Sequence, residues 1–258
     1  MLWRQEVLNA FNTPLILETR RALQMVNDDP SIRALVLTGE GRGFSSGADL
    51  AGGGHEGDPT NLTAGEGAAH GMEHRWNPMM DDFHTLSVPT VTAINGVAAG
   101  GGVGLALLAD VCIAAESARF VLTFGPKLGI VPDLGSTWQL PRRLPRGKAL
   151  PLALLGDPLS AQEAERLGMI WSVVPDADVV DEAVAVAERL AAASQPAMTE
   201  IRHIMDVAFR NSHKEQLELE RQAQKRLFDH EENPAKRGED EHSRKFREAA
   251  ARRSKSKL

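Results

Sequence analysis

Two glycine-rich turns are the first candidates for chemistry in this sequence. One spans residues 43–50 (Gly-Phe-Ser-Ser-Gly-Ala-Asp-Leu), and the other spans residues 95–104 (Asn-Gly-Val-Ala-Ala-Gly-Gly-Gly-Val-Gly) and runs directly into the apolar segment 105–108. Backbone N–H groups at the start of a helix have no partner within it, and the helix dipole adds partial positive charge there. Glycines let a ligand approach such groups closely. We therefore expect these turns to bind an oxygen that gains negative charge during a reaction.

Other interpretations of the same residues stay open. Close packing of a helix against a strand explains either turn by itself, and neither turn contains G-x-G-x-x-G or G-x-x-x-x-G-K-[ST]. His70-Gly-Met-Glu73-His74 matches the H-x-x-E-H pattern of zinc peptidases, with two imidazoles that would share one face of a helix. The pattern overlaps a glycine-rich stretch, 51–71, that we predict to be a loop. We expect no metal site.

Strands alternating with helices must position these turns. Short apolar runs at 33–38, 90–94 and 111–115 are typical of buried strands, and residues 15–26 have helical spacing. Strands separated by helices imply crossover connections, a largely parallel sheet and an α/β fold. After about Pro145 the pattern becomes helical, and residues 196–230 continue as helix.

Composition excludes several classes of protein. The chain has 258 residues, one cysteine (Cys112) and no tyrosine, which rules out an internal disulfide, a multi-thiolate zinc site and a tyrosine acid. No apolar run is long enough to span a membrane, and no secretory signal pattern begins the sequence. The net charge is −6, although residues 243–258 hold seven basic side chains against Glu248. An acidic body argues against nucleic acid as a partner, and we expect the basic end to be a solvated helix and tail.

Five motifs in order resemble the crotonase (enoyl-CoA hydratase/isomerase) superfamily, and together they cover residues 3 to about 232. The motifs are Glu6–Phe11, Phe44–Leu50, Pro89–Gly96 with the glycines 100–102, Leu128–Pro141 and Leu159–Gly168. The resemblance implies a spiral of ββα units over residues 1–195, here with the first β-hairpin missing, and a C-terminal helical region, 196–258, that helps form a homotrimer or homohexamer. It also implies an acyl-CoA thioester substrate and no cofactor beyond the coenzyme A of that substrate.

The resemblance assigns roles residue by residue. The family's oxyanion hole falls on the backbone N–H groups of Ala48 and Gly101, in agreement with the expectation from the two turns. Arg42 and the backbone around Ser45 and Ser46 match positions that hold coenzyme A. We add the adjoining Asp49 and Leu50 to this substrate-binding set, although Asp49 has an alternative role in satisfying loop N–H groups.

The acid–base residue distinguishes members of the family. The two glutamates of the hydratases correspond to Gly104 and Gly125, so hydration loses both carboxylates. Asp133 matches the single catalytic carboxylate of the enoyl-CoA isomerases and of the ring-epoxide isomerases of phenylacetyl-CoA breakdown. One carboxylate suffices for a 1,3-proton shift. From spacing alone, Asp133 follows Pro132 and precedes a predicted helix, which favours a role as helix N-cap; the family motif around it favours catalysis.

We therefore predict an acyl-CoA isomerase of fatty-acid or aromatic-acid catabolism. The alternatives are a hydratase-type relative with another acyl-CoA reaction (hydration, or hydrolysis with Asp133 as nucleophile) and a catalytically degenerate acyl-CoA binder. The expected location is the cytoplasm. The terminal Ser256-Lys257-Leu258 spells a peroxisomal address, which would indicate the peroxisomal matrix in a eukaryote.

Overall fold

The structure is a computed structural model that describes residues 1–49 and 62–230. The chain divides into two compact units, Met1–Ala191 and Ala192–Leu258. Leu50, the basic C-terminal segment and Ser256-Lys257-Leu258 lie outside the described residues. Within the described part, no helix combines the length and apolar character needed to cross a membrane.

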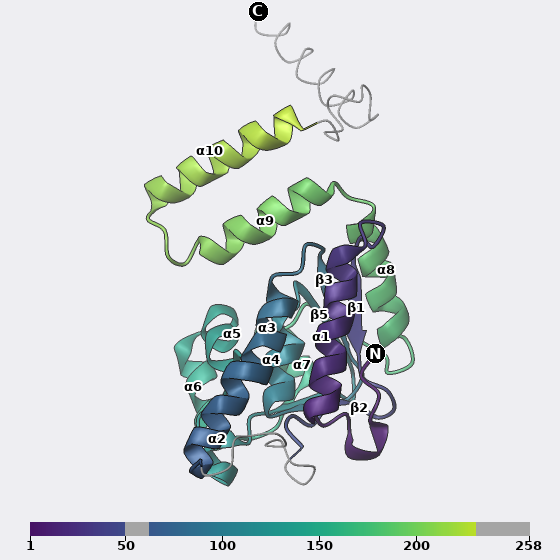
Figure 1. Cartoon of the computed structure of the whole chain (residues 1–258), viewed down its shortest axis with the longest axis vertical. Helices are drawn as coiled ribbons and strands as arrows, with labels where there is room; N and C mark the ends of the chain where they lie inside the picture. Colours follow the sequence, from purple (N-terminus) through teal and green to yellow (C-terminus); the bar gives the residue numbers. More distant parts are fainter. Residues whose placement is uncertain (50–61, 231–258) are drawn as a thin grey trace, which may run out of the picture. The chain divides into compact units, whose positions relative to one another are not determined.

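The first unit contains a parallel four-stranded sheet in the order β1-β3-β5-β8 (Figure 1). In the register, Val36 pairs with Val91 and Val91 pairs with Val111. Every residue of β3 is buried, which is typical of a central parallel strand covered on both faces. The bounds are β1 Leu35–Thr38, β3 Thr90–Ile94, β5 Val111–Ala115 and β8 Ser172–Val174.

A second four-stranded sheet has the order β2-β4-β6-β7, in which β6 and β7 are antiparallel and the other pairs are parallel. The strands from β1 to β6 alternate between the two sheets, so β1, β3 and β5 are each followed by a strand of the second sheet. This repetition, with helices after the strand pairs, is the predicted spiral of ββα units. The bounds are β2 Gly43–Ser45, β4 Val97–Ala99, β6 Arg119–Val121 and β7 Leu159–Ser160.

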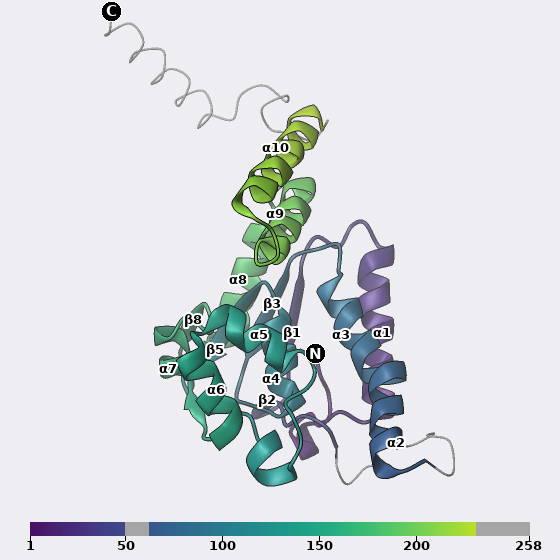
Figure 2. The ribbon, with the colours of Figure 1, turned by 90° about the vertical axis from the view of Figure 1, so that its left-hand side faces the viewer.

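Helices cover the sheets, and Figures 1 and 2 show α1 and α3 side by side, as their contacts require. Helix α8 packs on the first sheet against β1, β3 and β5. Helix α1 begins where the Asn12 side chain accepts a hydrogen bond from the Leu15 N–H, which satisfies one of the unpaired donors of the first turn. The helices and helical turns of this unit are η1 Gln5–Val7, α1 Thr13–Asp28, α2 Ala64–Gly71, η2 Met72–Trp76, α3 Asn77–His84, α4 Gly101–Leu108, η3 Phe124–Leu128, α5 Ser136–Arg143, α6 Arg146–Leu155, α7 Ala161–Arg166 and α8 Val179–Ala191.

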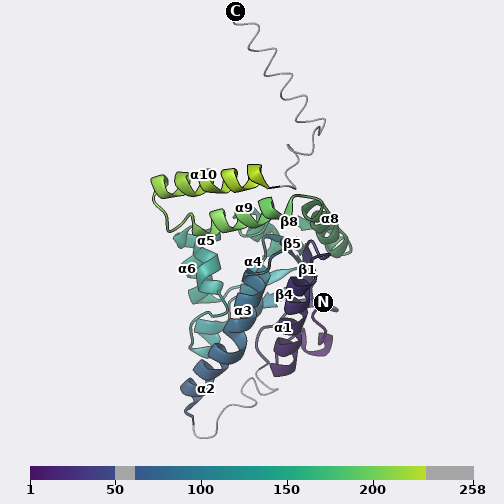
Figure 3. The ribbon, with the colours of Figure 1, turned by 45° about the horizontal axis from the view of Figure 1, so that its top comes forward.

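The second unit is described as far as residue 230 and consists of α9 (Gln195–Val207) and α10 (His213–Asp229). The two helices lie side by side (Figure 3) and are joined by an ion pair between Arg226 Nε and Glu200 Oε1 at 2.7 Å. Ser212 begins α10 with a reciprocal capping box to Glu215. The prediction of continuous helix over 196–230 is therefore wrong at this break.

Two further predictions from the sequence are corrected. The stretch 51–71 is not a loop throughout, because α2 begins at Ala64 with a Thr63–Glu66 capping box; residues 50–61 lie outside the described part. The region after Pro145 is not purely helical, because it contributes β7 and β8. These strands have two and three residues, which is too short for a period of two to be visible in the sequence.

Candidate active site

In the segment after β2, the backbone N–H of Ala48 points away from Phe11, which lies beside it in space. Phe11 forms a parallel bridge with Ala48: the Phe11 N–H donates to the Gly47 carbonyl at 2.8 Å, and the Asp49 N–H donates to the Phe11 carbonyl at 2.9 Å. Backbone groups alternate in direction along an extended segment, so the N–H of Ala48 points to the opposite side. It therefore takes no part in this bridge, and Ala48 itself is exposed.

The first residue of α4 lies beside this segment. Gly100 precedes the helix with a φ of 53°, and the N–H of Gly101 has no partner inside α4 because it belongs to the first turn. A Cβ atom on Gly47 would lie 3.1 Å from the Gly101 nitrogen and 2.8 Å from the Ala99 carbonyl oxygen. The two glycine-rich turns are thus in contact, and they meet at a residue that must lack a side chain.

Asp133 brings a carboxylate to the same place. Its Oδ1 lies 3.7 Å from the position that a Cβ on Gly101 would occupy. Burial raises the pKa of Asp133 from 3.8 to about 6, against the lowering effect of a hydrogen bond from its own backbone. Helix α5 begins at Ser136 with Gly135 as its N-cap, and no side chain caps it. The N-cap interpretation of Asp133 is therefore wrong, and its carboxylate lies beside Gly101 of α4.

Gly104 and Gly125, the positions that the resemblance matches to the hydratase glutamates, differ in the space around them. A Cβ on Gly104 would collide with the Leu134 carbonyl oxygen and would lie 3.0 Å from Ser136 Oγ. A Cβ on Gly125 would meet the Ala153 carbonyl oxygen at 3.6 Å, an ordinary contact. A carboxylate-bearing side chain at position 104 is therefore incompatible with this arrangement of the backbone. Position 125 has space for a Cβ atom, but its residue is glycine.

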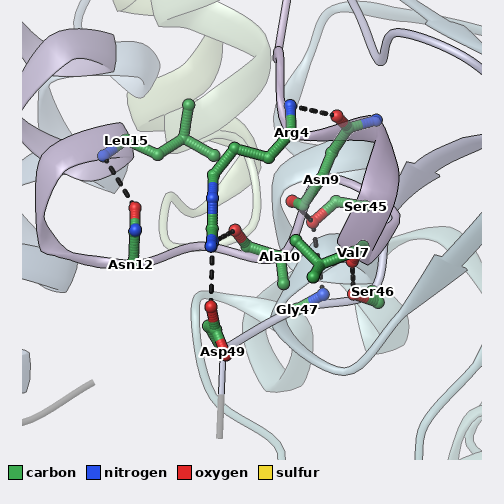
Figure 4. Close-up of polar contacts among 10 residues, drawn as sticks. All are labelled: Arg4, Val7, Asn9, Ala10, Asn12, Leu15, Ser45, Ser46, Gly47 and Asp49. Carbon is green, nitrogen blue, oxygen red and sulfur yellow. Dashed lines mark hydrogen bonds and ion pairs between the residues drawn. The ribbon is translucent and has the colours of Figure 1, made fainter. Parts of the chain in front are cut away.

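A network of hydrogen bonds from the first eleven residues holds the Ala48 segment in place (Figure 4). The buried Asn9 side chain donates to the carbonyls of Glu40 and Gly43 and accepts from the Arg4 N–H at 2.8 Å. The Asn9 carbonyl accepts a hydrogen bond from Ser45 Oγ at 3.0 Å. Sequence reasoning missed the roles of Arg4 and Asn9. Asn9 has a left-handed backbone with a φ of 55°, which asparagine tolerates better than most residues.

The structure places the predicted coenzyme A residues in different environments. Arg42 is exposed on the turn before β2, whereas Ser45 is buried. Ser46 Oγ donates to the Val7 carbonyl, and Asp49 forms an ion pair with Arg4 at 2.9 Å. The side chains of Ser45, Ser46 and Asp49 thus bond within the protein, and Leu50 lies outside the described residues.

The histidine pair at 70 and 74 lies where α2 runs into η2. Their rings stack with centroids 4.1 Å apart, and the His74 Nδ1 bonds the His70 carbonyl. Nowhere in residues 1–49 and 62–230 do three or more His, Cys, Asp or Glu side chains gather as metal ligands would.

Comparison with known proteins places this geometry in a family. The Enoyl-CoA hydratase/isomerase family model matches residues 1–248. The 1,2-epoxyphenylacetyl-CoA isomerase of Escherichia coli (strain K12) is 42% identical over 222 residues, which cover 86% of this chain and 83% of that protein. A protein of Rhodobacter capsulatus named "Probable enoyl-CoA hydratase" is 38% identical over 230 residues, covering 87% of this chain and 83% of that protein.

A solved structure agrees with the sequence relatives. An enoyl-CoA hydratase from Polaromonas sp. JS666 has a TM-score of 0.80 and 32% identity, covering 89% of this chain and 87% of that one. The predicted α/β fold with C-terminal helices is confirmed. The chain belongs to the enoyl-CoA hydratase/isomerase family, the crotonase superfamily.

Proposed function

We propose that this protein is an acyl-CoA isomerase that moves a double bond by a 1,3-proton shift. Asp133 takes a proton from the carbon next to the thioester carbonyl and returns it two carbons away. The N–H groups of Ala48 and Gly101 hold the oxygen of the dienolate formed in between. Donors that are already in place for a developing charge are usually a large part of catalysis, and loss of one costs about 2.7–4 kcal/mol of barrier.

The observation that carries this proposal is the carboxylate of Asp133 beside Gly101. A pKa of about 6 leaves most of the carboxylate ionised at neutral pH while keeping it a stronger base than an ordinary aspartate. A general base works best when its pKa lies near the operating pH. The E. coli relative is itself named an isomerase.

Hydration is the main alternative, since other relatives are named hydratases. Addition of water needs one group to activate the water and another to manage the proton. Position 104 has no room for a carboxylate beside the Leu134 carbonyl, and position 125 is glycine. A single carboxylate at this place in the described chain fits isomerisation better than hydration.

Binding and assembly complete the proposal. The substrate is an acyl-CoA thioester, and exposed Arg42 and the backbone of residues 45–49 face its coenzyme A portion. Helix α9 carries the exposed residues Ile201 and Met205 four residues apart, and such spacing gives one apolar stripe. This stripe supports a homotrimer or homohexamer, which the molar mass in solution tests directly.

The test follows the absorbance of the conjugated thioester when a 3-enoyl-CoA is added to the wild type, Asp133→Asn and Asp157→Asn. Asp157 is an exposed aspartate and serves as the matched control. Isomerisation by the wild type and by Asp157→Asn, with loss of at least about 10²-fold in Asp133→Asn, is the expected result. Equal rates in Asp133→Asn would show that another group is the base.

Two further measurements separate the alternatives. Efficient hydration of a 2-enoyl-CoA by the wild type would show that the protein is a hydratase and would reject the proposed isomerase activity. Binding of acyl-CoA without exchange of the proton next to the carbonyl in D2O would indicate a degenerate binder.

A further inference from the structure

The turn that carries Asp133 contains a residue in an unfavourable backbone conformation. Leu134 has a φ of 47° and Gly135 has a φ of 76°, and the Ser136 N–H donates to the Asp133 carbonyl at 2.9 Å. These values describe a type I′ turn, in which glycine, asparagine and aspartate dominate the central positions. A leucine with a positive φ persists only when its surroundings hold it there.

Those surroundings are two glycines on one face of α4. The buried side chain of Leu134 lies against Gly101: a Cβ on that glycine would collide with Leu134 Cδ1 and would lie 3.1 Å from its Cγ. The carbonyl of Leu134 lies against Gly104, three residues along the helix. Residues i and i+3 are neighbours on a helix surface. Leu134 is therefore held against one face of α4 by its side chain at Gly101 and by its carbonyl at Gly104.

We propose that Leu134 is a positioning residue that docks the Asp133 turn on α4 and holds the carboxylate, shielded from water, beside the N–H of Gly101. The expected effect of Leu134 on kcat rests on the proposed function, whereas the docking of the Asp133 turn on α4 does not depend on it. The neighbouring residue fixes where the carboxylate points, because the two share one turn. Its apolar side chain also covers the helix surface that water would otherwise reach.

The environment of Asp133 reports on this role. Its raised pKa comes from burial, and within the described chain no charged side chain contributes to it. Two of the α4 residues that the turn contacts are glycines, Gly101 and Gly104. If Leu134 supplies the shielding, its truncation admits water and lowers the pKa of Asp133 toward the ordinary value of 3.8. A merely structural leucine would leave that pKa unchanged in the folded variants.

The experiment titrates the Asp133 carboxyl by ¹³C NMR in the full-length protein, with Asp133→Asn to assign the signal. The variants are Leu134→Gly, which removes both the side chain and the backbone strain, Leu134→Asn, which keeps a left-handed turn, and Leu134→Met, which keeps the apolar contact. Leu8→Gly is the matched control for strain, because Leu8 also has a positive φ (52°). The pH profile, kcat and KM for a 3-enoyl-CoA are measured in parallel.

We expect the pKa of Asp133 to fall by at least about one unit in Leu134→Gly and Leu134→Asn and to stay near the wild-type value in Leu134→Met and Leu8→Gly. We expect kcat to fall roughly 10- to 100-fold in the first two variants with KM changed less than about threefold, since small displacements of a reacting group cost this much. If Leu134→Gly does not fold, Leu134→Asn and Leu134→Met decide the question.

An unchanged Asp133 pKa in folded Leu134→Gly or Leu134→Asn overturns the positioning role, whatever the activity. A lowered pKa in a protein whose wild type does not isomerise supports the positioning role and rejects the proposed function. If the wild type isomerises and the pKa of Asp133 is unchanged in the Leu134 variants, the proposed function is supported and the positioning role is rejected.

Discussion

The contact between Gly104 and the Leu134 carbonyl predicts that a single added methyl group at position 104 destabilises this protein. In Gly104→Ala the new Cβ falls well inside van der Waals contact with backbone that a clamped turn holds in place. Overpacking of this kind costs up to about 3 kcal/mol. Replacing a helical glycine by alanine returns about 1 kcal/mol. The net expectation is a loss of about 2 kcal/mol in the free energy of unfolding.

Gly125→Ala is the matched control, because its Cβ has an ordinary contact at 3.6 Å with the Ala153 carbonyl. For a chain of this size, the loss in Gly104→Ala corresponds to a melting temperature lowered by about 4–8 °C, whereas Gly125→Ala melts within about 2 °C of the wild type or above it. Thermal unfolding followed by circular dichroism at one protein concentration checks both. Equal melting temperatures for the two variants would refute the reasoning from the Leu134 carbonyl.

Three more predictions concern the site. Because the pKa of Asp133 is raised to about 6, kcat rises with pH through about 6 as the base ionises. The folded state binds this proton more tightly than the unfolded state does, so the stabilisation from protonated Asp133 is full below pH 3.8 and is lost as pH rises through about 6. We therefore expect Asp133→Asn to be more stable than the wild type by about 1–3 kcal/mol at pH 7 and equally stable near pH 3.5. Denaturant unfolding at the two pH values measures both differences. Ala48→Pro removes the proposed oxyanion donor and lowers kcat by about 10²–10³-fold, and acyl-CoA affinity measured by calorimetry shows whether binding survives. Asn9→Ala removes the Asn9 donor to the Glu40 and Gly43 carbonyls, of which the Gly43 carbonyl keeps a longer bond from Asn95, so unfolding measurements give a loss of about 1–3 kcal/mol. Full stability in this variant contradicts a stabilising role of the Asn9 side chain.

The features that could be predicted from the sequence alone are those that leave a local pattern in it. The central strands β3 and β5 are runs of apolar and β-branched residues because both faces of a parallel sheet are buried, and such runs are visible in the sequence. The two glycine-rich turns stand out because glycine is needed where backbones approach each other, as at Gly47. The loss of both hydratase acids is likewise a matter of residue identity at positions 104 and 125.

Other features depend on contacts between residues far apart in the chain. The short strands β7 and β8 exist because β6 and β5 offer them partners, and residues 159–160 have no period of their own. The bridge from Phe11 that orients the Ala48 N–H joins segments more than 30 residues apart, and its geometry cannot be read from either segment alone.

The chemistry of Asp133 divides in the same way. Its presence in a family motif, and the absence of acids at 104 and 125, were determined by the sequence. Its proximity to Gly101, the collision that forbids a side chain at 104, and the raised pKa were decided by tertiary structure. The physical reason is that a carboxyl pKa and a steric exclusion both depend on which atoms surround a group in space. Here the turn that holds Asp133 and Leu134 contacts helix α4, about 30 residues away in the chain.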